Sequence, residues 1–142
     1  MRQVDAHTFR DIIAHMKGSM KPPLGFSLHL HSVAEYREMV CMVDETNMHF
    51  GAGFAVHLGR GELVNGYSIA KGNGDRLVQE AIRIGATNLD CYDGPLFDLY
   101  SRNGFVEVNR EKWDDAYADP RWDKKLWGTP DVVFMEYKTE LD

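Results

Sequence analysis

The sequence predicts one α/β domain of the α+β type, in which helices flank a mixed, mostly antiparallel sheet. Three observations support this fold class: an amphipathic helical pattern near the N-terminus, a change to two-residue alternation from Met48, and strands that alternate with helices only in the second half. Because that alternation is confined to one half, the sheet is expected to be mixed. A chain of 142 residues can bury a sizeable core, so we expect residues 1–142 to form a single domain.

Composition and charge narrow the class of protein. Hydrophobic residues make up 44% of the chain and charged residues 27%, as in ordinary globular domains, and no apolar run approaches a membrane span of roughly 18 residues. The N-terminus has no signal-peptide pattern, so we expect a cytoplasmic protein without a membrane partner. The net charge of −6 argues against broad nucleic-acid binding, which needs a basic surface.

The first predicted element is an amphipathic helix that Asp5 caps. Its apolar positions have helical spacing: Phe9, Ile12, Ile13 and Met16. Gly18 and then Pro22–Pro23 are expected to end it, because proline disfavours helix at and just before its own position.

Two further elements are predicted before the central hairpin. Residues 26–30 alternate apolar and polar side chains, which indicates a short strand or an extended segment. Ser32 and Glu35 have the spacing of a capping box, which predicts a helix over residues 33–42.

The rest of the chain predicts a hairpin followed by alternating helices and strands. From Met48 one strand face carries Phe50, Ala52, Phe54, Val56 and Leu58. The turn Gly59–Gly61 leads into a returning strand, Glu62–Ile69. The later predicted elements are a helix from Asp75 to Gly85, a strand at 88–92, a helix at 95–102 and strands at 105–109 and 131–137.

A glycine-rich turn separates the returning strand from the next helix. Lys71–Leu77 has the pattern G-x-G-x-x-L, and glycines there let an anion approach the main chain closely. Backbone N–H groups and the positive end of the helix can then bind a phosphate. The alternative interpretation is a plain strand-to-helix turn.

About thirty residues after this turn comes a second motif, and together the two resemble one family. The segment Leu99–Phe105 reads Leu-Tyr-x-x-x-Gly-Phe. With this motif, Gly51–Val108 and the closing strand resemble the GNAT superfamily of acyl-CoA-dependent N-acyltransferases, over about half of the chain. In that family a turn of the form R/Q-x-x-G-x-G/A holds the pyrophosphate of coenzyme A. Lys71, Gly72, Gly74 and Leu77 match its basic, glycine and buried positions.

The resemblance implies an activity and a set of site residues. It implies transfer of an acetyl or other acyl group from acyl-CoA to an amine by direct attack, with acetyl-CoA as co-substrate and no metal. Tyr100 would protonate the departing thiolate as general acid. Residues of the turn would bind the cofactor: Ile69, Lys71, Gly72, Asn73, Gly74, Asp75 and Arg76. An amine-bearing small molecule or a protein would be the acceptor, and a homodimer stays open.

Several acidic side chains are candidates for the catalytic base. Glu62 and Asn65 lie on the strand that often carries this base in the family, and Asp90 and Asp93 lie near the end of the next strand. Glu62 beside the hairpin turn has a second interpretation as a solvated edge carboxylate. The carboxylates of the next strand can also serve to recognise a cationic amine.

The sequence departs from the family pattern in ways that support a second function. Ile69 replaces the Arg/Gln of the turn, the connection into the glycines is short, and the following helix lacks about one turn, or about 3.6 residues. The alternative is therefore a GNAT-like protein without acyl transfer that binds another protein. The segment Leu89–Gly94 and the Trp-rich region also resemble small GNAT-like proteins of phages and mobile elements.

The aromatic segment before the last strand is the candidate partner surface. Within Arg110–Thr129, tryptophans, a tyrosine and aspartates alternate: Trp113, Asp114, Asp115, Tyr117, Asp119, Trp122, Asp123 and Trp127. The segment Trp113–Trp127 would be a substrate lid or a protein-binding surface, or a loop whose aromatic rings attach it to the sheet edge.

Histidines and cysteines give weaker signals. His29 and His31 share one face of an extended segment, but no other ligand stands at the spacing of a known zinc motif, so surface histidines are expected. Cys41 and Cys91 are too few for a disulfide framework and are expected to be reduced, with Cys91 in the core.

Overall fold

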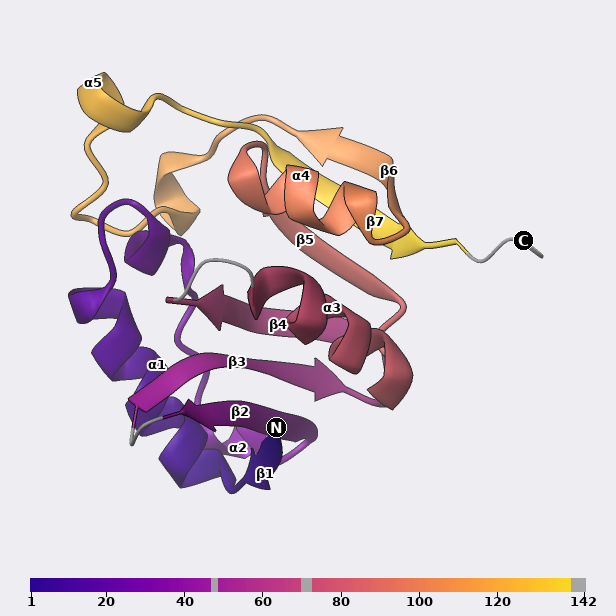
Figure 1. The fold of residues 1–142 in the computed structure, drawn as a ribbon. Coiled ribbons are helices and arrows are strands. Elements are labelled where there is room, and N and C mark those ends of the chain that lie inside the picture. Colours follow the sequence, from indigo (N-terminus) through magenta and orange to yellow (C-terminus); the bar gives the residue numbers. More distant parts are fainter. Residues whose placement is uncertain (47–48, 70–72, 139–142) are drawn as a thin grey trace.

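The computed structural model describes residues 1–46, 49–69 and 73–138, which form one seven-stranded sheet flanked by helices (Figure 1). The elements are β1 (Arg2–Val4), α1 (Ala6–Ser19), the 3₁₀ turn η1 (Leu24–Ser27), α2 (Val33–Tyr36), β2 (Met39–Thr46), β3 (His49–His57), β4 (Glu62–Ser68), α3 (Asn73–Ile84), β5 (Asn88–Tyr92), α4 (Pro95–Arg102), β6 (Phe105–Glu111), η2 (Asp115–Tyr117), α5 (Lys124–Trp127) and β7 (Val132–Tyr137). The strand order is β1-β2-β3-β4-β5-β7-β6, with β4 and β5 parallel and the other described pairs antiparallel. The predicted mixed, mostly antiparallel sheet is confirmed.

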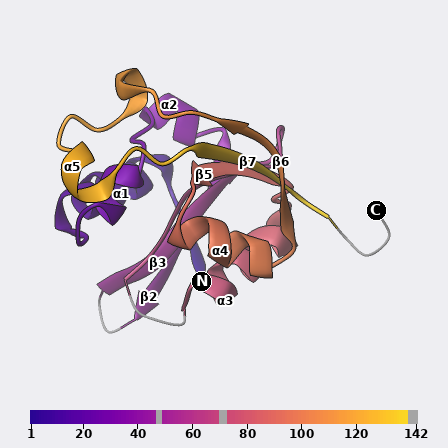
Figure 2. The same ribbon diagram turned by 90° about the horizontal axis from the view of Figure 1, so that it is seen from above.

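Helices lie on both faces of the sheet (Figure 2), and each face carries its own apolar cluster. Helices α1 and α2 pack on one face, where Phe9, Ile13 and Tyr36 are fully buried. Helices α3 and α4 pack on the other, around Phe54 and Val78. We refer to these as the α1/α2 face and the α3/α4 face.

The N-terminal helix forms as its apolar spacing predicts. Phe9, Ile12, Ile13 and Met16 are its buried residues, and the Asp5 carboxylate accepts a hydrogen bond from the Thr8 backbone N–H at 2.8 Å. The helix continues through Gly18 to Ser19, one turn before the prolines.

The predictions for residues 26–42 are partly wrong. The expected strand at 26–30 is the 3₁₀ turn η1 followed by an extended segment. The capping box of Ser32 is confirmed, but its helix is a single turn, and β2 begins at Met39. Met39, Cys41 and Val43 pack on the α1/α2 face, whereas Val40 and Met42 pack on the other. A strand buried on both faces is apolar at consecutive positions, so it lacks the alternation that distinguishes it from a helix.

The hairpin and the later elements follow the sequence closely. Strands β3 and β4 are joined at the predicted turn, β5 and α4 have their predicted bounds, and α3 starts at Asn73 and ends before Gly85. Leu58 lies outside the strand and is 55% exposed, and the side chain of Phe50 lies outside the described part. β1, which pairs with β2, was not predicted. None of the helices in the described ranges combines the length and the apolar character of a membrane span.

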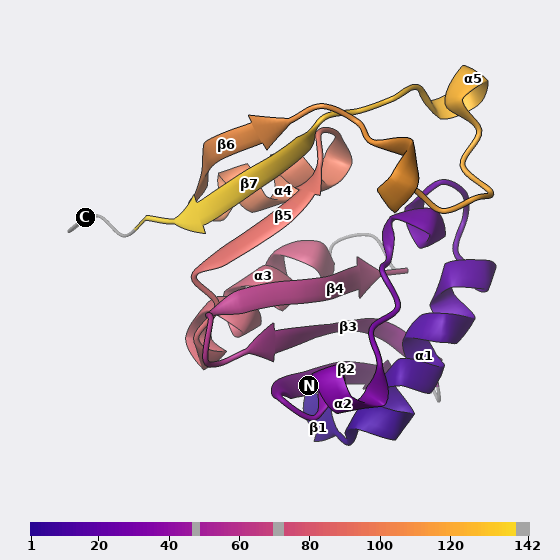
Figure 3. The same ribbon diagram turned by 180° about the vertical axis from the view of Figure 1, so that it is seen from behind.

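The parallel strands β4 and β5 diverge from their first residues onward. Glu62 and Asn88 form the one pair recorded between them, and beyond it the strands separate (Figures 1 and 3). Beyond Glu62, backbone groups on this edge of β4 therefore have no recorded pairing partner in β5, and we refer to the region between the diverging strands as the opening.

We expect the core around Phe54 to dominate stability. Phe54→Ala should lower the free energy of unfolding by about 3–5 kcal/mol, because the fully buried ring leaves a cavity between the sheet and α3. Urea denaturation measures this loss. The control Leu58→Ala removes a 55% exposed side chain and should change stability by no more than about 0.5 kcal/mol. Equal losses in the two variants would contradict the assignment of the core.

Candidate active site

A β-bulge in β4 lies beside the opening between β4 and β5. Ala55 pairs with Val64 and Gly53 with Tyr67, so that Asn65 and Gly66 both lie opposite Phe54. Asn65 has a φ of 54°, which asparagine tolerates better than most residues.

The bulge distributes side chains to the two faces in an unusual order. Leu63 packs on the α3/α4 face, and Val64 and Asn65 then both contact the α1/α2 side. Gly66 returns to the α3/α4 face, where a Cβ atom on it would lie 2.9 Å from the Tyr100 hydroxyl. Because of this one extra residue, Asn65 lies on the α1/α2 side of the opening and the next residue, Gly66, lies on the α3/α4 side.

Tyr100, the predicted general acid, lies on α4 at the α3/α4 side of this opening. Its side chain is 5% exposed and packs edge-on against Phe105 with 5.9 Å between ring centroids. Burial raises the pKa of Tyr100 above its ordinary value, and the neighbouring Cys91 and Asp90 raise it further. The phenol is consequently protonated at neutral pH, as a proton donor must be.

On the other face, Asn65 holds the segment that connects η1 to α2. Its side-chain Nδ2 donates to the His29 carbonyl at 2.7 Å, and its Oδ1 accepts from the Tyr36 hydroxyl at 2.6 Å. The His31 backbone N–H donates to the same Tyr36 oxygen at 3.2 Å. The segment His29–His31 therefore crosses β4 at the bulge (Figure 3).

Asp90 of β5 and His29 are titratable side chains that lie within electrostatic range of each other at this side of the opening. Both are exposed to solvent. Loss of solvent around Asp90 raises the pKa of its carboxyl, and the charge of Glu62 adds to this effect. The pKa of His29 is lowered, first by desolvation and then by the nearby His31, while Asp90 opposes the change. An unprotonated imidazole thus lies within electrostatic range of a carboxylate.

The other predicted bases have different surroundings. Glu62 lies at the closed end of the opening, where it pairs with Asn88 and its carboxylate is 3.8 Å from the Arg60 guanidinium. The Asp93 carboxylate accepts a hydrogen bond from Arg110 at 2.6 Å. Asp90 is therefore the candidate that the opening exposes.

The predicted cofactor turn is described only in part. Lys71 and Gly72 lie outside the described residues, and Ile69, which precedes them, is 59% exposed. Asn73 begins α3, and a Cβ atom on Gly74 would lie 3.1 Å from the side chain of Leu99 on α4.

Two charged residues of the turn are already paired. The Asp75 carboxylate accepts hydrogen bonds from Arg102 at 2.8 Å and from Asn103 at 2.7 Å, which lower the pKa of Asp75 to about 2. Arg76 lies 3.4 Å from the Asp44 carboxylate. The negative charge of Asp75 at the helix N-terminus is thus largely compensated by Arg102.

Where the structure describes their side chains, the histidines and Cys91 do not form a metal site. The rings of His29 and His31 pack edge-to-face with centroids 4.7 Å apart, and His31 interacts with Glu35 at 3.0 Å. In the described part of the chain, no group of three His, Cys, Asp or Glu side chains is arranged to hold a metal. Burial raises the pKa of the Cys91 thiol to about 12, so it is a poor nucleophile.

The aromatic segment packs against the rest of the protein. Trp113 stacks on Tyr92 of β5 with 5.3 Å between the ring centroids, and the Trp122 ring packs against both of these rings. Trp122 also packs against Trp127, which in turn contacts Phe26 of η1. Asp119 forms ion pairs with both Lys17 of α1 and Arg121. These contacts attach the segment to the α1/α2 face. Among the large apolar side chains of this segment, Tyr117, at 85%, and Leu126, at 73%, are exposed.

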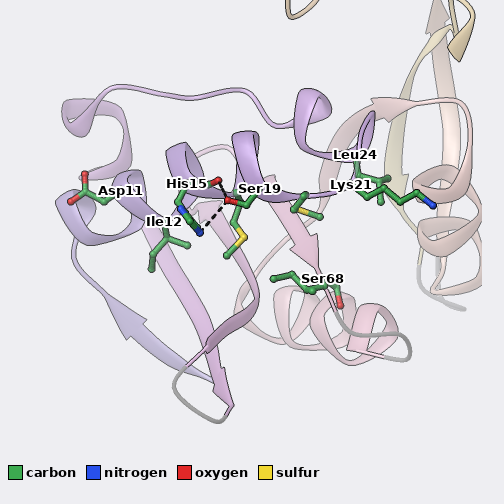
Figure 4. A pocket seen from close by; sticks show the side chains of 10 residues that line it. Asp11, Ile12, His15, Ser19, Lys21, Leu24 and Ser68 are labelled. Carbon is green, nitrogen blue, oxygen red and sulfur yellow. Dashed lines mark hydrogen bonds between the residues drawn. The ribbon is translucent and has the colours of Figure 1, made fainter. Parts of the chain in front are cut away.

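A groove of about 600 Å³ lies between α1 and the end of β4 (Figure 4). Ser68 and Ile69 form its wall on the strand side, and Ile12, Met16 and Lys21 are among its residues from α1 and the loop after it. His15 and Ser19 are hydrogen-bonded to each other on its helical side. Tyr100, Asp90 and His29 are not among its lining residues, so we base the site on the opening between β4 and β5, where the reactive groups gather.

Comparison with solved structures identifies this architecture. A ribosomal-protein-alanine N-acetyltransferase from Brucella melitensis matches with a TM-score of 0.60 and 16% identity, covering 97% of this chain and 98% of that one. A GNAT family acetyltransferase from Elizabethkingia anophelis with acetyl-CoA bound gives 0.59 and 14%, covering 86% and 94%. A Bacillus subtilis acetyltransferase in complex with CoA gives 0.54 and 16%, covering 75% and 82%.

These similarities establish that the chain has the fold of the GNAT acetyltransferases. The fold that the sequence resemblance implied is therefore confirmed. No family model and no curated protein sequence matches the chain.

Sequence reasoning missed two features of this site. The bulge at Asn65 depends on pairing between strands, although an Asn-Gly dipeptide inside a strand pattern is a signal for such an irregularity. His29 was expected to be a surface histidine, with a metal ligand as the weaker alternative, and the contact that holds its main chain comes from Asn65, which is far away in the sequence.

The proximity of Gly66 to Tyr100 gives a test that needs no substrate. Gly66→Ala should lower the free energy of unfolding by about 1–3 kcal/mol, because the new methyl group lies too close to the phenolic oxygen. In a Tyr100→Phe background, which lacks that oxygen, the same substitution should cost markedly less, with a coupling of about 0.5–3 kcal/mol. Denaturant titration of the four proteins measures the coupling. Additive losses would mean that the two residues do not meet.

Proposed function

We propose that this protein is an acyl-CoA-dependent N-acyltransferase that transfers an acetyl or similar acyl group to an amine by direct attack. The observation that carries this proposal is the protonated Tyr100 hydroxyl, which lies beside Gly66 at the opening between β4 and β5. Acetyltransferases with CoA or acetyl-CoA bound share the fold, which adds support.

The opening suits the thioester end of the cofactor. The diverging edge of β4 offers backbone groups without a strand partner in β5, and such N–H groups can polarise a thioester carbonyl. Gly66 has no side chain to obstruct this edge. Tyr100 would then donate its proton to the departing thiolate, which requires a phenol that stays protonated until that step.

The start of α3 would bind the pyrophosphate. Asn73 and Gly74 present the first backbone N–H groups of the helix, and Lys71 and Gly72 precede them in the sequence. Arg102 compensates the charge of Asp75, so the helix N-terminus can accept an anion. Ile69 lacks the charge of the family residue, which predicts a weaker phosphate contact at that point.

Calorimetric titration with acetyl-CoA tests the cofactor assignment. We expect micromolar binding, and Gly74→Trp should weaken it by about tenfold or more, equivalent to about 1.4 kcal/mol, because the indole would occupy the start of α3 beside Leu99. The matched control, Gly18→Trp, adds the same ring at an exposed position of α1 that has open space around it, and should bind normally.

No binding of acetyl-CoA or free coenzyme A to folded protein would contradict the enzymatic proposal. The alternative, a GNAT-fold module that binds another protein through the segment Trp113–Trp127, would then become the better interpretation. Its supporting observation is the exposure of Tyr117 and Leu126 on that segment.

Loss of the Tyr100 hydroxyl should affect turnover and not cofactor binding. With acetyl-CoA and 1,4-diaminobutane as acceptor, Tyr100→Phe is expected to lower kcat by about 10²-fold, the usual contribution of a general acid. Its dissociation constant for acetyl-CoA should stay within about threefold of the wild-type value, because the aromatic ring still packs on Phe105. The rate is measured from the release of the coenzyme A thiol, which is detected with a chromogenic disulfide reagent. Unchanged turnover would remove Tyr100 from the mechanism.

A further inference from the structure

We propose that His29 takes the proton from the acceptor's ammonium group and that Asp90 holds this ammonium, so the acceptor is an aliphatic primary amine that approaches from the α1/α2 face. This inference rests on the proposed function and assigns its second half, the binding and activation of the acceptor. Glu62, which was one of the candidate bases that the sequence offered, is given no proton-transfer role.

His29 is held where it can act. Asn65 fixes its carbonyl at 2.7 Å, and two residues further on Arg10 donates to the His31 carbonyl at 2.9 Å. The Tyr36 hydroxyl holds the His31 N–H from the other side. The main chain from the His29 carbonyl to His31 is thereby anchored to the sheet, to α1 and to α2, while the His29 ring itself stays exposed.

The neighbouring groups are less suitable as bases. His31 is engaged by Glu35, whose carboxylate interacts with its Nδ1 at 3.0 Å. Glu62 is at the closed end of the opening, near Arg60. In contrast, no hydrogen-bond partner for the His29 ring is found among the described residues. Its two nitrogens are therefore available to a substrate.

Desolvation is the main cause that lowers the pKa of His29. The charges of His31 and of Lys17 on α1 lower it further, whereas Glu35 of α2 and Asp90 of β5 oppose the change. The balance lowers the pKa of His29 below the ordinary imidazole value of about 6.5. At neutral pH the ring can accept a proton as soon as an ammonium group arrives.

Asp90 supplies the other half of the subsite. Within the described ranges it has no ion-pair partner, although its charge reaches His29 on one face and Tyr100 on the other. An ammonium group would provide the missing counter-ion, and the second carboxylate at Glu62 favours acceptors with a further positive charge. The acceptor nitrogen would then lie between the proton-accepting and the proton-donating side chains.

The proposed transfer balances. One ammonium proton moves to a ring nitrogen of His29, and the freed amine lone pair forms the bond to the thioester carbon. The carbon–sulfur bond breaks with its electron pair on sulfur, which receives the Tyr100 proton. The amide nitrogen loses its second proton through solvent to the tyrosinate, and His29 releases its proton to solvent.

The test compares His29→Gln with the matched control His31→Gln, using acetyl-CoA and either 1,4-diaminobutane or a lysine-containing pentapeptide. His29→Gln should lower kcat by about 10²-fold or more, as expected for loss of a general base, with acetyl-CoA binding unchanged. With hydroxylamine, a nucleophile that is already unprotonated at neutral pH, the loss should shrink to less than about fivefold because no base is needed. His31→Gln should retain activity within about threefold, since its ring does not contact the amine.

The pH profile separates a catalytic role from a structural one. Wild-type activity should fall as the pH drops through the lowered pKa of His29, because the protonated ring cannot accept a proton. In His29→Gln this acid limb should disappear. In His31→Gln it should move to higher pH, because removing the His31 charge lets the pKa of His29 rise.

Each contrary outcome has a distinct meaning. Equal losses with diaminobutane and hydroxylamine, or an acid limb that survives in His29→Gln, would overturn the role of His29. Wild-type protein that binds acetyl-CoA but acetylates neither amine would overturn the acceptor assignment. Failure to bind acetyl-CoA would instead overturn the proposed function.

The role of the Asp90 carboxylate has its own test. Asp90→Asn should raise the KM for diaminobutane about tenfold, and an unchanged KM would show that Asp90 does not bind the ammonium group.

Discussion

The site depends on a single irregularity, the bulge at Asn65 in β4. A regular strand would send consecutive side chains to opposite faces, so Asn65 and Val64 could not both reach the α1/α2 face. The extra residue lets the Asn65 amide hold His29–His31 while Gly66 leaves room for Tyr100 on the other face. The bulge thus positions the groups on both sides of the opening. The positive φ of Asn65 is the local backbone strain that this bulge requires.

The opening persists because each half of the sheet has its own support. β4 pairs with β3 over most of its length, and β5 pairs with β7 through all five of its residues, so neither strand needs the other beyond Glu62 and Asn88. The aromatic segment then connects the halves on the α1/α2 face, through Trp127 on Phe26 and Asp119 on Lys17. Its tryptophan rings take part in this packing and are only partly exposed, whereas Tyr117 and Leu126 are the large apolar side chains of the segment that are exposed.

Sequence patterns predicted the elements that local chemistry determines. The apolar spacing and the Asp5 cap specify α1, the glycine turn specifies the hairpin, and the Leu99–Phe105 motif locates α4 and Tyr100. β2 was misassigned because burial on both faces removes the period that distinguishes strand from helix. The proposed role of His29 could not be predicted from the sequence. Asn65, which binds its carbonyl, and Asp90, whose charge acts on its ring, are both far away along the chain, and local sequence patterns carry no information on such proximity.

The pairing of Asp75 links the two ends of the proposed site. Arg102 and Asn103, at the end of α4, both bind this carboxylate in the first turn of α3, and Tyr100 stands only two residues before Arg102. An acidic side chain at a helix N-terminus would ordinarily compete with phosphate for the same positive potential. Here the carboxylate is turned toward α4 and paired there with Arg102 and Asn103, so it joins the two helices. The position of Tyr100, the proposed proton donor, is therefore coupled to the helix that would bind the pyrophosphate.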